Sequence, residues 1–346
     1  MAVTVNKNSE TKASDSPSNG RRVSMYKFNN LPGSQRFAIW LSLFACLSLA
    51  LVVIWEPGLE FPVNWGAGLA AWINDRIKDI TREGAFIFDA ISNVVLYFLL
   101  FLEDVFIWIP WPAIICAIAL VTWRMVGWKV ALFAVGSLLT TGALGMWTSA
   151  METTALIVVA VIISIAIAIP VGVIAARSNL IDAILRPVLD GMQTMPAFVY
   201  LVPAIMFFGI GNVPAIFATV IYAVPPAIRL TNLGIRQVSS ETVEAAESFG
   251  TTPRQLLLKV QIPMAVPTIM AGINQTTMMA LGMVVIASLV GAGGLGEDVL
   301  RALSRFQPGE ALLGGLAIVA LAIITDRVTQ AAAKGRQDAL SGDRQL

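Results

Sequence analysis

The sequence contains no histidine, and its two cysteines, Cys46 and Cys116, both lie inside apolar runs. Most zinc ligands, most catalytic bases and all disulfides come from these residue types. The sequence therefore offers almost no residues from which a metal site, a histidine-dependent active site or a disulfide could be built. A phosphate-binding loop of the type Gly-x4-Gly-Lys-Ser/Thr is also missing. We therefore expect no catalytic residue, no metal site and no bound cofactor. If ATP drives this protein, another chain binds it.

Charge is also scarce, because only 13% of the 346 residues are charged whereas 57% are hydrophobic. An ordinary soluble domain carries about 25% charged residues. The net charge of +1 provides no basic surface for nucleic acid. The composition therefore predicts an all-α polytopic membrane protein.

Long apolar stretches indicate about eight transmembrane helices, since a helix needs about 20 apolar residues to cross a bilayer. The predicted spans are residues 37–55, 105–123, 130–147, 155–176, 196–208, 213–228, 268–290 and 311–324. Residues 94–102 are also apolar, but Glu103 and Asp104 follow them, so we expect an interfacial segment there. No charged residue lies well inside a predicted span, so the sequence shows no residues that could relay a proton or an ion across the membrane.

The arginines and lysines predict the orientation, because they gather in cytoplasmic loops. With eight crossings and both termini in the cytoplasm, nearly every loop satisfies this rule. The residues placed in the cytoplasm are Arg124, Lys129, Arg177, Arg186, Arg229, Arg236, Arg254, Lys259, Arg327 and Lys334. Arg301 and Arg305 are exceptions on the outer side.

Four regions are expected along the chain. Residues 1–36 form a disordered cytoplasmic tail, and residues 37–147 hold the N-terminal spans together with an amphipathic helix around Trp72 to Arg82. That helix either lies at the membrane surface or packs against neighbouring spans. Residues 148–328 form the core, and residues 329–346 form a cytoplasmic C-terminal tail.

A polar hairpin of two short helices, residues 229–263, interrupts the core. Ser239 or Ser240 can cap the first helix, and Gly250 stops it. Thr252, Pro253 and Gln255 have the spacing of a capping box that starts the second helix, and we expect Pro263 to end it.

This hairpin resembles the EAA loop of permease subunits in bacterial ABC importers of type I. The matching residues are Glu244, Ala245, Ala246, Gly250, Val260, Ile262 and Pro263. In that family the loop is the cytoplasmic coupling helix that sits in a cleft of the ATPase subunit. The alternative is a surface hairpin whose glutamates and alanines reflect helix propensity alone.

The stretch 190–203 resembles the corresponding segment of osmoprotectant permeases, which import glycine betaine, proline betaine or choline, and so do residues 208–214 and the region from Pro267 to Gln275. Aromatic faces recognise quaternary ammonium groups, and prolines interrupt helices beside cavities. The candidate pathway residues are Met195, Pro196, Phe198, Tyr200, Asn274 and Gln275. Core packing is the competing role for the two aromatic residues, and helix-to-helix hydrogen bonding is the competing role for the two amides.

The glycine-rich stretch 291–296 lacks the Lys-Ser/Thr of a nucleotide loop, so we interpret it as a tight turn on the outer face. The resemblance implies a permease subunit in the bacterial inner membrane, present in two copies and embedded in lipid. It further implies a separate cytoplasmic ATPase, an external substrate-binding protein and a small quaternary ammonium or zwitterionic substrate. Two other classes stay open: an ion-coupled secondary transporter of a small zwitterion, and a nontransporting membrane scaffold.

Overall fold

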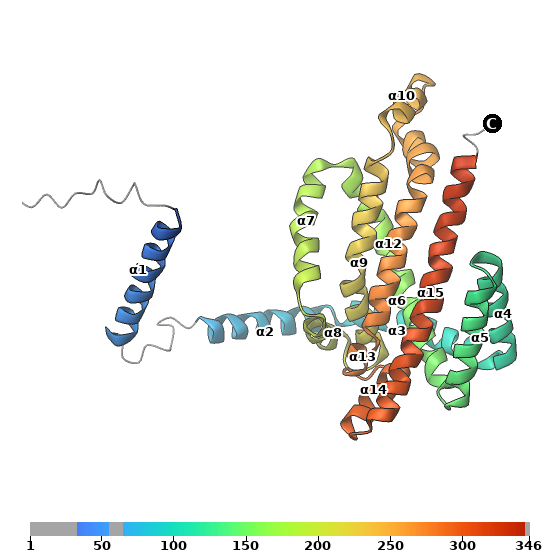
Figure 1. Ribbon diagram of the computed structural model, residues 1–346, viewed down its shortest axis with the longest axis horizontal. Helices are drawn as coiled ribbons and strands as arrows, with labels where there is room; N and C mark the ends of the chain where they lie inside the picture. Colours follow the sequence, from blue (N-terminus) through green and yellow to red (C-terminus); the bar gives the residue numbers. More distant parts are fainter. Residues whose placement is uncertain (1–32, 55–64, 343–346) are drawn as a thin grey trace, which may run out of the picture. The chain divides into compact units, whose positions relative to one another are not determined.

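The computed structural model describes residues 33–54 and 65–342, and every regular element in these ranges is a helix (Figure 1). The predicted all-α fold is therefore confirmed for the described chain. In order, the elements are α1 (Gly33–Ile54), α2 (Gly66–Glu83), α3 (Ala85–Trp108), α4 (Trp111–Met125), α5 (Trp128–Ala143), α6 (Trp147–Arg177), α7 (Asn179–Thr194), η2 (Ala197–Tyr200), α8 (Leu201–Phe208), α9 (Asn212–Arg236), α10 (Ser240–Ser248), α11 (Pro253–Gln255), η3 (Leu256–Gln261), α12 (Ile262–Gly282), α13 (Val284–Ser288), α14 (Leu295–Ser304) and α15 (Pro308–Gly342).

The chain divides into two units, residues 1–72 and residues 73–346. The first unit contains α1, an apolar helix of 22 residues. The predicted N-terminal tail falls mostly on residues 1–32, outside the described chain. The predicted amphipathic helix is present as α2, and none of its side chains is buried. The predicted C-terminal tail, residues 329–346, is helical as far as Gly342.

Five helices among the described residues are long and apolar enough to cross a membrane: α3, α6, α9, the continuous helix Pro253–Gly282 and α15. A sixth span is obtained if α7 is joined to the segment Ala197–Phe208, from which it is bent by 108°. Residues 37–51, α4 and α5 are apolar but shorter. The expected number of eight full spans is thus reached only when these shorter helices are included.

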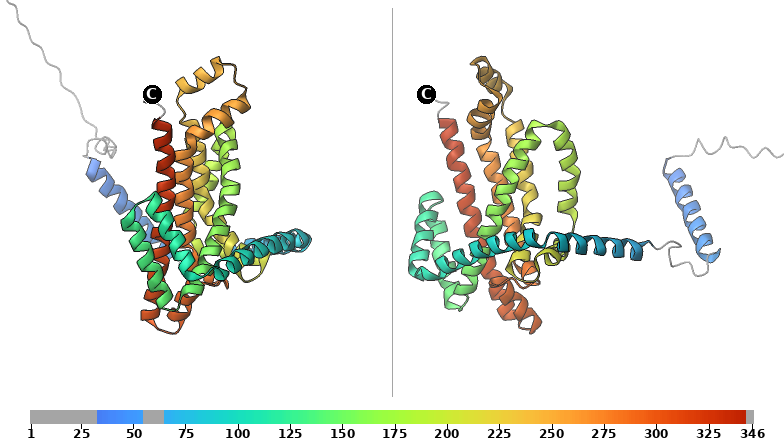
Figure 2. Two further views of the ribbon diagram at one scale, coloured as in Figure 1. Left: turned by 90° about the vertical axis from the view of Figure 1, so that its right-hand side faces the viewer. Right: turned by 180° about the vertical axis from the view of Figure 1, so that it is seen from behind.

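Two predicted boundaries in the N-terminal third are wrong. Glu103 and Asp104 do not end the apolar segment 94–102, because α3 continues to Trp108. The predicted span 105–123 is broken before Trp111, where the extended backbone of Ile109 and Pro110 separates α3 from α4. Pro110 has no amide hydrogen to continue the helical ladder. In Figure 2, α3 runs across the long helices rather than alongside them.

The predicted span 196–208 is also wrong. It consists of η2 and α8, two short helices that together are too short to cross a bilayer. Helix α7, which precedes this segment, also contacts α9. It was not predicted as a span because it carries polar side chains, Asp182 and Arg186 among them. Its C-terminus lies at Met195, where the backbone becomes extended before Pro196.

Helix α9 is the centre of the second unit, because 72% of its most apolar window is buried and no other candidate span exceeds 33%. Glycines allow its neighbours to approach closely. A Cβ atom added to Gly172 of α6 would lie 2.6 Å from Thr231 Cβ of α9. Gly234 of α9 and Gly272 of α12 make similarly close contacts between those two helices. Small residues at such crossings are how membrane helices gain packing energy, since lipid provides little hydrophobic drive.

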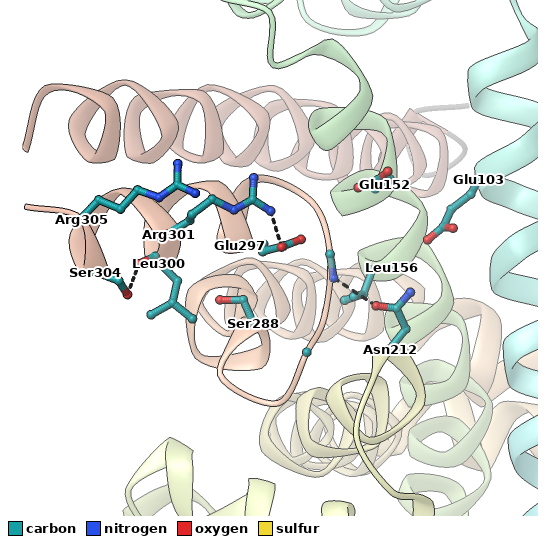
Figure 3. Close-up of a pocket in the computed structure, with 12 residues that line it drawn as sticks. Glu103, Glu152, Leu156, Asn212, Ser288, Glu297, Leu300, Arg301, Ser304 and Arg305 are labelled. Atoms are coloured by element: carbon teal, nitrogen blue, oxygen red, sulfur yellow. Dashed lines mark hydrogen bonds and ion pairs between the residues drawn. The ribbon is translucent and has the colours of Figure 1, made fainter. Parts of the chain in front are cut away.

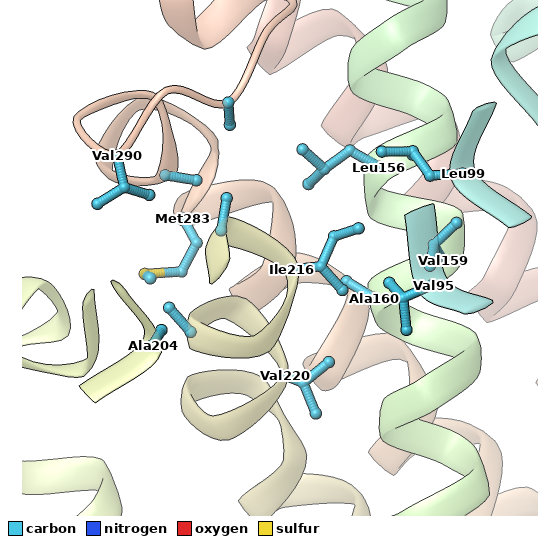
Figure 4. Close-up of a cluster of buried hydrophobic side chains, with 14 of the residues drawn as sticks. Val95, Leu99, Leu156, Val159, Ala160, Ala204, Ile216, Val220, Met283 and Val290 are labelled. Carbon is cyan, nitrogen blue, oxygen red and sulfur yellow. The ribbon is translucent and has the colours of Figure 1, made fainter. Parts of the chain in front are cut away.

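A cluster of fully buried side chains joins α9 to four other segments (Figure 4). Ile216 of α9 lies among Leu99 of α3, Val159 of α6 and Met283, and each of these side chains is 0% exposed. Ala204 of α8 completes the cluster from the opposite side. This packing fixes the start of α9 within the bundle.

Gly172→Ala should destabilise the protein by about 1–3 kcal/mol, because the added methyl group overpacks the contact between α6 and α9. Gly136→Ala is the matched control, since Gly136 lies in α5 and a Cβ atom added there would have no neighbour within 4 Å. Thermal unfolding of both variants in detergent checks this, and equal midpoints for the two would refute the close-packing explanation.

Candidate functional site

The predicted hairpin 229–263 begins within α9 and ends within α12. Its part between these helices, residues 237–261, extends beyond the long helices at one end of the bundle, and the name polar hairpin refers to this part from here on (Figure 1). Its first helix is α10, which begins after Ser239. Ser239 occupies the N-cap position, as predicted, but its side chain makes no capping bond to the backbone, and its hydroxyl lies 2.7 Å from the Thr242 hydroxyl instead. Gly250 ends α10 with φ +76°, as predicted, and this left-handed conformation favours glycine.

The second helix begins with the predicted capping box. The Thr252 amide donates to Gln255 Oε1 at 2.9 Å, and the Gln255 amide donates to Thr252 Oγ1 at 3.4 Å. Pro263 does not end this helix, which corrects the prediction. The backbone widens into a π-helical stretch, η3, where Ile262 donates to the Leu257 carbonyl, and the chain then continues into α12. The wider turn accommodates Pro263, which cannot donate a backbone hydrogen bond.

The base of the hairpin is packed into the bundle. Leu257 of η3 is buried with Ile235 of α9 and with Ala265 and Ile269 of α12. Of the predicted coupling residues, Ala246 is buried, and Val260, Ile262 and Pro263 are half-buried. The other three, Glu244, Ala245 and Gly250, are exposed.

Two large apolar side chains of the hairpin are open to the surroundings. Phe249 is 90% exposed and Leu258 is 63% exposed. Apolar side chains this exposed on an otherwise polar hairpin are typical of a surface that contacts another protein. The hairpin thus combines a packed base with exposed apolar side chains.

A polar network surrounds the point where α9 leads into the hairpin. Arg236, the last residue of α9, donates to Asn179 Oδ1 at 2.7 Å and to the Ala175 carbonyl at 2.8 Å. Its Nε also donates to Asn232 Oδ1 at 2.8 Å. These bonds connect α9 to the end of α6 and the start of α7.

Asp182 of α7 is the buried anion of the same network, with 6% of the residue exposed. It accepts hydrogen bonds from Arg186 Nη2 at 2.6 Å and from Asn232 Nδ2 at 2.7 Å, and Arg236 Nη2 lies 3.8 Å away. A buried carboxylate needs such partners to offset its desolvation.

The candidate pathway residues do not share one location. Phe198 is 60% exposed, whereas Tyr200 is buried in the core and its hydroxyl donates to the Met192 carbonyl. Met195 and Pro196 form the bend between α7 and η2. No hydrogen bond or ring contact between described residues joins this group to the two amides of α12.

Asn274 connects α12 to α15. Its Nδ2 donates to Asp326 Oδ1 at 2.9 Å, and its Oδ1 accepts from the Thr329 hydroxyl. Gln275 beside it is exposed. Asp326 lies inside a candidate span, and so do Glu103 of α3 and Glu152 of α6. All three carboxylates lie just outside the predicted spans 105–123, 155–176 and 311–324, and they fall within helices because the helices are longer than hydropathy predicted.

The end of the bundle opposite the hairpin holds a polar cavity of about 660 Å³, which we call the α14 pocket (Figures 1 and 3). Its charged and amide lining residues are Glu103, Glu152, Asn212, Glu297, Arg301 and Arg305. The predicted tight turn forms one wall, and Gly291 and Gly294 both have φ +90°. The Gly293 amide donates to Asn212 Oδ1 at 3.1 Å, which attaches this turn to the first residue of α9.

Sequence reasoning missed this pocket, although one signal pointed to it. Arg301 and Arg305 were the exceptions to the predicted charge distribution, and both line the cavity. Glu103 and Glu152, which lie far apart in the sequence, join them only through the folding of α3 and α6.

Comparisons with known proteins agree with this architecture. Residues 168–336 match the family described as "Binding-protein-dependent transport system inner membrane component". The glycine betaine/proline betaine transport system permease protein ProW of Escherichia coli (strain K12) is 47% identical, with 80% of this chain and 77% of that protein covered. The glycine betaine/carnitine transport permease protein GbuB of Listeria monocytogenes serotype 1/2a (strain 10403S) is 47% identical, with coverages of 76% and 94%.

A third relative, the glycine betaine transport system permease protein OpuAB of Bacillus subtilis (strain 168), is 45% identical over 75% of this chain and 92% of that protein. Among solved structures, the inward-facing MetNI methionine ABC transporter superposes with a TM-score of 0.51 and 21% identity, covering 55% of this chain and 95% of that chain. That likeness shows the fold. The chain therefore belongs to the binding-protein-dependent transport system inner membrane component family, and it is a multi-pass permease subunit of an ABC importer.

Proposed function

We propose that this permease subunit imports glycine betaine or a related quaternary ammonium osmoprotectant such as proline betaine or choline. Glycine betaine occurs in the names of all three relatives described above. The segment 190–203, which carries the bend at Met195 and Pro196, resembles the same class of permease.

ATP hydrolysis belongs to a separate cytoplasmic subunit in this proposal, and the polar hairpin is its contact site. The observation that carries this assignment is the hairpin's construction: Phe249 and Leu258 are exposed, while Leu257 anchors the base to α9 and α12. The hairpin end then faces the cytoplasm together with both chain termini. Two copies of the permease would receive two ATPases, and an external binding protein would dock at the α14 end.

Mechanically, closure of the ATPase pair on ATP would displace the two hairpins. Because the base of each hairpin is packed on α9 and α12, these helices would move with it as a rigid body. The bonds of Arg236 would carry the same displacement to α6 and α7. Rocking of these helices opens the path to the outside, and hydrolysis resets it.

We retain the candidate pathway residues as part of this proposal, with different roles. Phe198 is exposed and can offer its ring to a quaternary ammonium group. Met195 and Pro196 shape the bend that presents it. Tyr200, Asn274 and Gln275 support the path indirectly, since Tyr200 holds the end of α7 and Asn274 holds α15.

The substrate assignment predicts ATP-dependent uptake of radiolabelled glycine betaine by proteoliposomes that contain the permease, its ATPase and the loaded binding protein. Uptake should be competed by unlabelled proline betaine but not by methionine. Absence of glycine betaine uptake from a complex that hydrolyses ATP would rule out this substrate class.

Gly250→Val should uncouple ATP hydrolysis from uptake, because a β-branched residue at φ +76° is strained and would reorient α10 relative to η3. Gly145→Val is the matched control, since Gly145 has the same φ of +76° and equal space but lies in the turn after α5. Membrane insertion is expected for both variants. The measurement is the number of substrate molecules taken up per ATP hydrolysed, and a wild-type ratio in Gly250→Val would contradict the proposed transmission of movement through the hairpin.

Arg236→Gln should lower the unfolding free energy by about 2 kcal/mol, because hydrogen bonds to charged groups contribute about 1.5–3 kcal/mol. Arg229→Gln should cost less than about 1 kcal/mol, since Arg229 pairs with the exposed Asp190 at the surface. Thermal unfolding compares the two variants. A smaller loss for Arg236→Gln than for Arg229→Gln would show that the network does not hold α9 to α6 and α7.

A further inference from the structure

The α14 pocket separates its charges in space. In Figure 3, Arg301 and Arg305 project from α14 on one side, while Glu103 and Glu152 lie on the other side. Glu297 lies between the two groups and pairs with Arg301. The two arginines and the two glutamates Glu103 and Glu152 therefore lie on different sides of the cavity.

Only part of this charge is neutralised within the described chain. Arg301 is paired with Glu297 and lies 3.7 Å from Asp298 Oδ1. Glu103, Glu152 and Arg305 take part in no ion pair among the described residues. Both glutamates are half-buried, and a carboxylate removed from water gains from an opposite charge placed beside it.

The size of the cavity suits a small molecule. Its volume of about 660 Å³ falls in the range of about 300–1,000 Å³ that is usual for ligand sites. None of the twelve lining residues is aromatic, so the pocket lacks the cage that binds quaternary ammonium groups tightly. Attraction here comes from opposite charges in a partly hydrated space, which favours brief occupation over tight retention.

We propose that the α14 pocket is a transit site that receives the zwitterionic substrate before it enters the path through the bundle. The quaternary ammonium group is directed toward Glu103 and Glu152, and the substrate carboxylate is directed toward Arg305. This assignment rests on the proposed function and adds the residues that orient the substrate.

Helix α9 connects the α14 pocket to the polar hairpin. Asn212, the first residue of α9, holds the Gly293 amide in the pocket wall, and Arg236 at the other end of α9 adjoins the polar hairpin. Because α9 is one continuous helix, a movement of the hairpin that displaces α9 also displaces the wall of the pocket. The substrate can thus be released from the pocket in step with the ATPase.

The test uses the complete transporter in proteoliposomes with glycine betaine supplied on a saturating binding protein. Arg305→Gln and Glu152→Gln should each lower the number of glycine betaine molecules taken up per ATP hydrolysed about tenfold, the size of effect expected when one charged partner is lost. Arg305→Lys retains the positive charge and should restore most of the coupling. Glu310→Gln is the matched control, because Glu310 is an exposed glutamate at the start of α15 that does not line the pocket.

Each outcome has one meaning. Unchanged uptake per ATP in both Arg305→Gln and Glu152→Gln would overturn the transit site while leaving the proposed function intact. Reduced ATP hydrolysis at an unchanged ratio would assign these residues to docking of the binding protein and would also overturn it. Failure of the wild-type complex to take up glycine betaine would end both proposals.

Discussion

The close approach of α9 to α6 and α12 is the constraint on which the rest of the structure depends. It exists because Gly172, Gly234 and Gly272 have no side chain of their own at these contacts, so the facing helix can approach their backbone. In a bilayer, contact of this kind replaces the hydrophobic drive that organises a soluble core. A tightly held helix can move only together with its neighbours. Displacement at either end of α9 is therefore shared by the whole bundle.

Both functional regions lie at the ends of this helix. The polar hairpin follows Arg236 at the C-terminus of α9, and Asn212 at its N-terminus lines the α14 pocket. The fold consequently separates the contact with an ATPase from the entry of substrate by the full length of α9. Within the described chain, the only extended polar network at the hairpin base is the one around Asp182, which makes α6 and α7 part of the same moving unit.

The sequence predicted features that depend on local chemistry. The capping box at Thr252 and the helix end at Gly250 follow from residue type and spacing alone. Prediction from the sequence failed where tertiary contacts determine the structure. Helix α7 was missed because Asp182 makes it look polar, and two of the groups that stabilise this carboxylate, Asn232 and Arg236, lie about fifty residues away in the sequence. The continuation of the chain through Pro263 depends on a π-helical turn, and the α14 pocket depends on helices that sequence spacing cannot bring together.

The central claim is that the polar hairpin receives the ATPase. Photo-crosslinking tests it most directly, with benzoylphenylalanine at Phe249 and, as a control, at Phe306, which is 92% exposed at the opposite end. The account predicts crosslinks from position 249 to the ATPase that change in yield with ATP, and none from position 306. Crosslinks to the ATPase from position 306, or none from position 249, would contradict it.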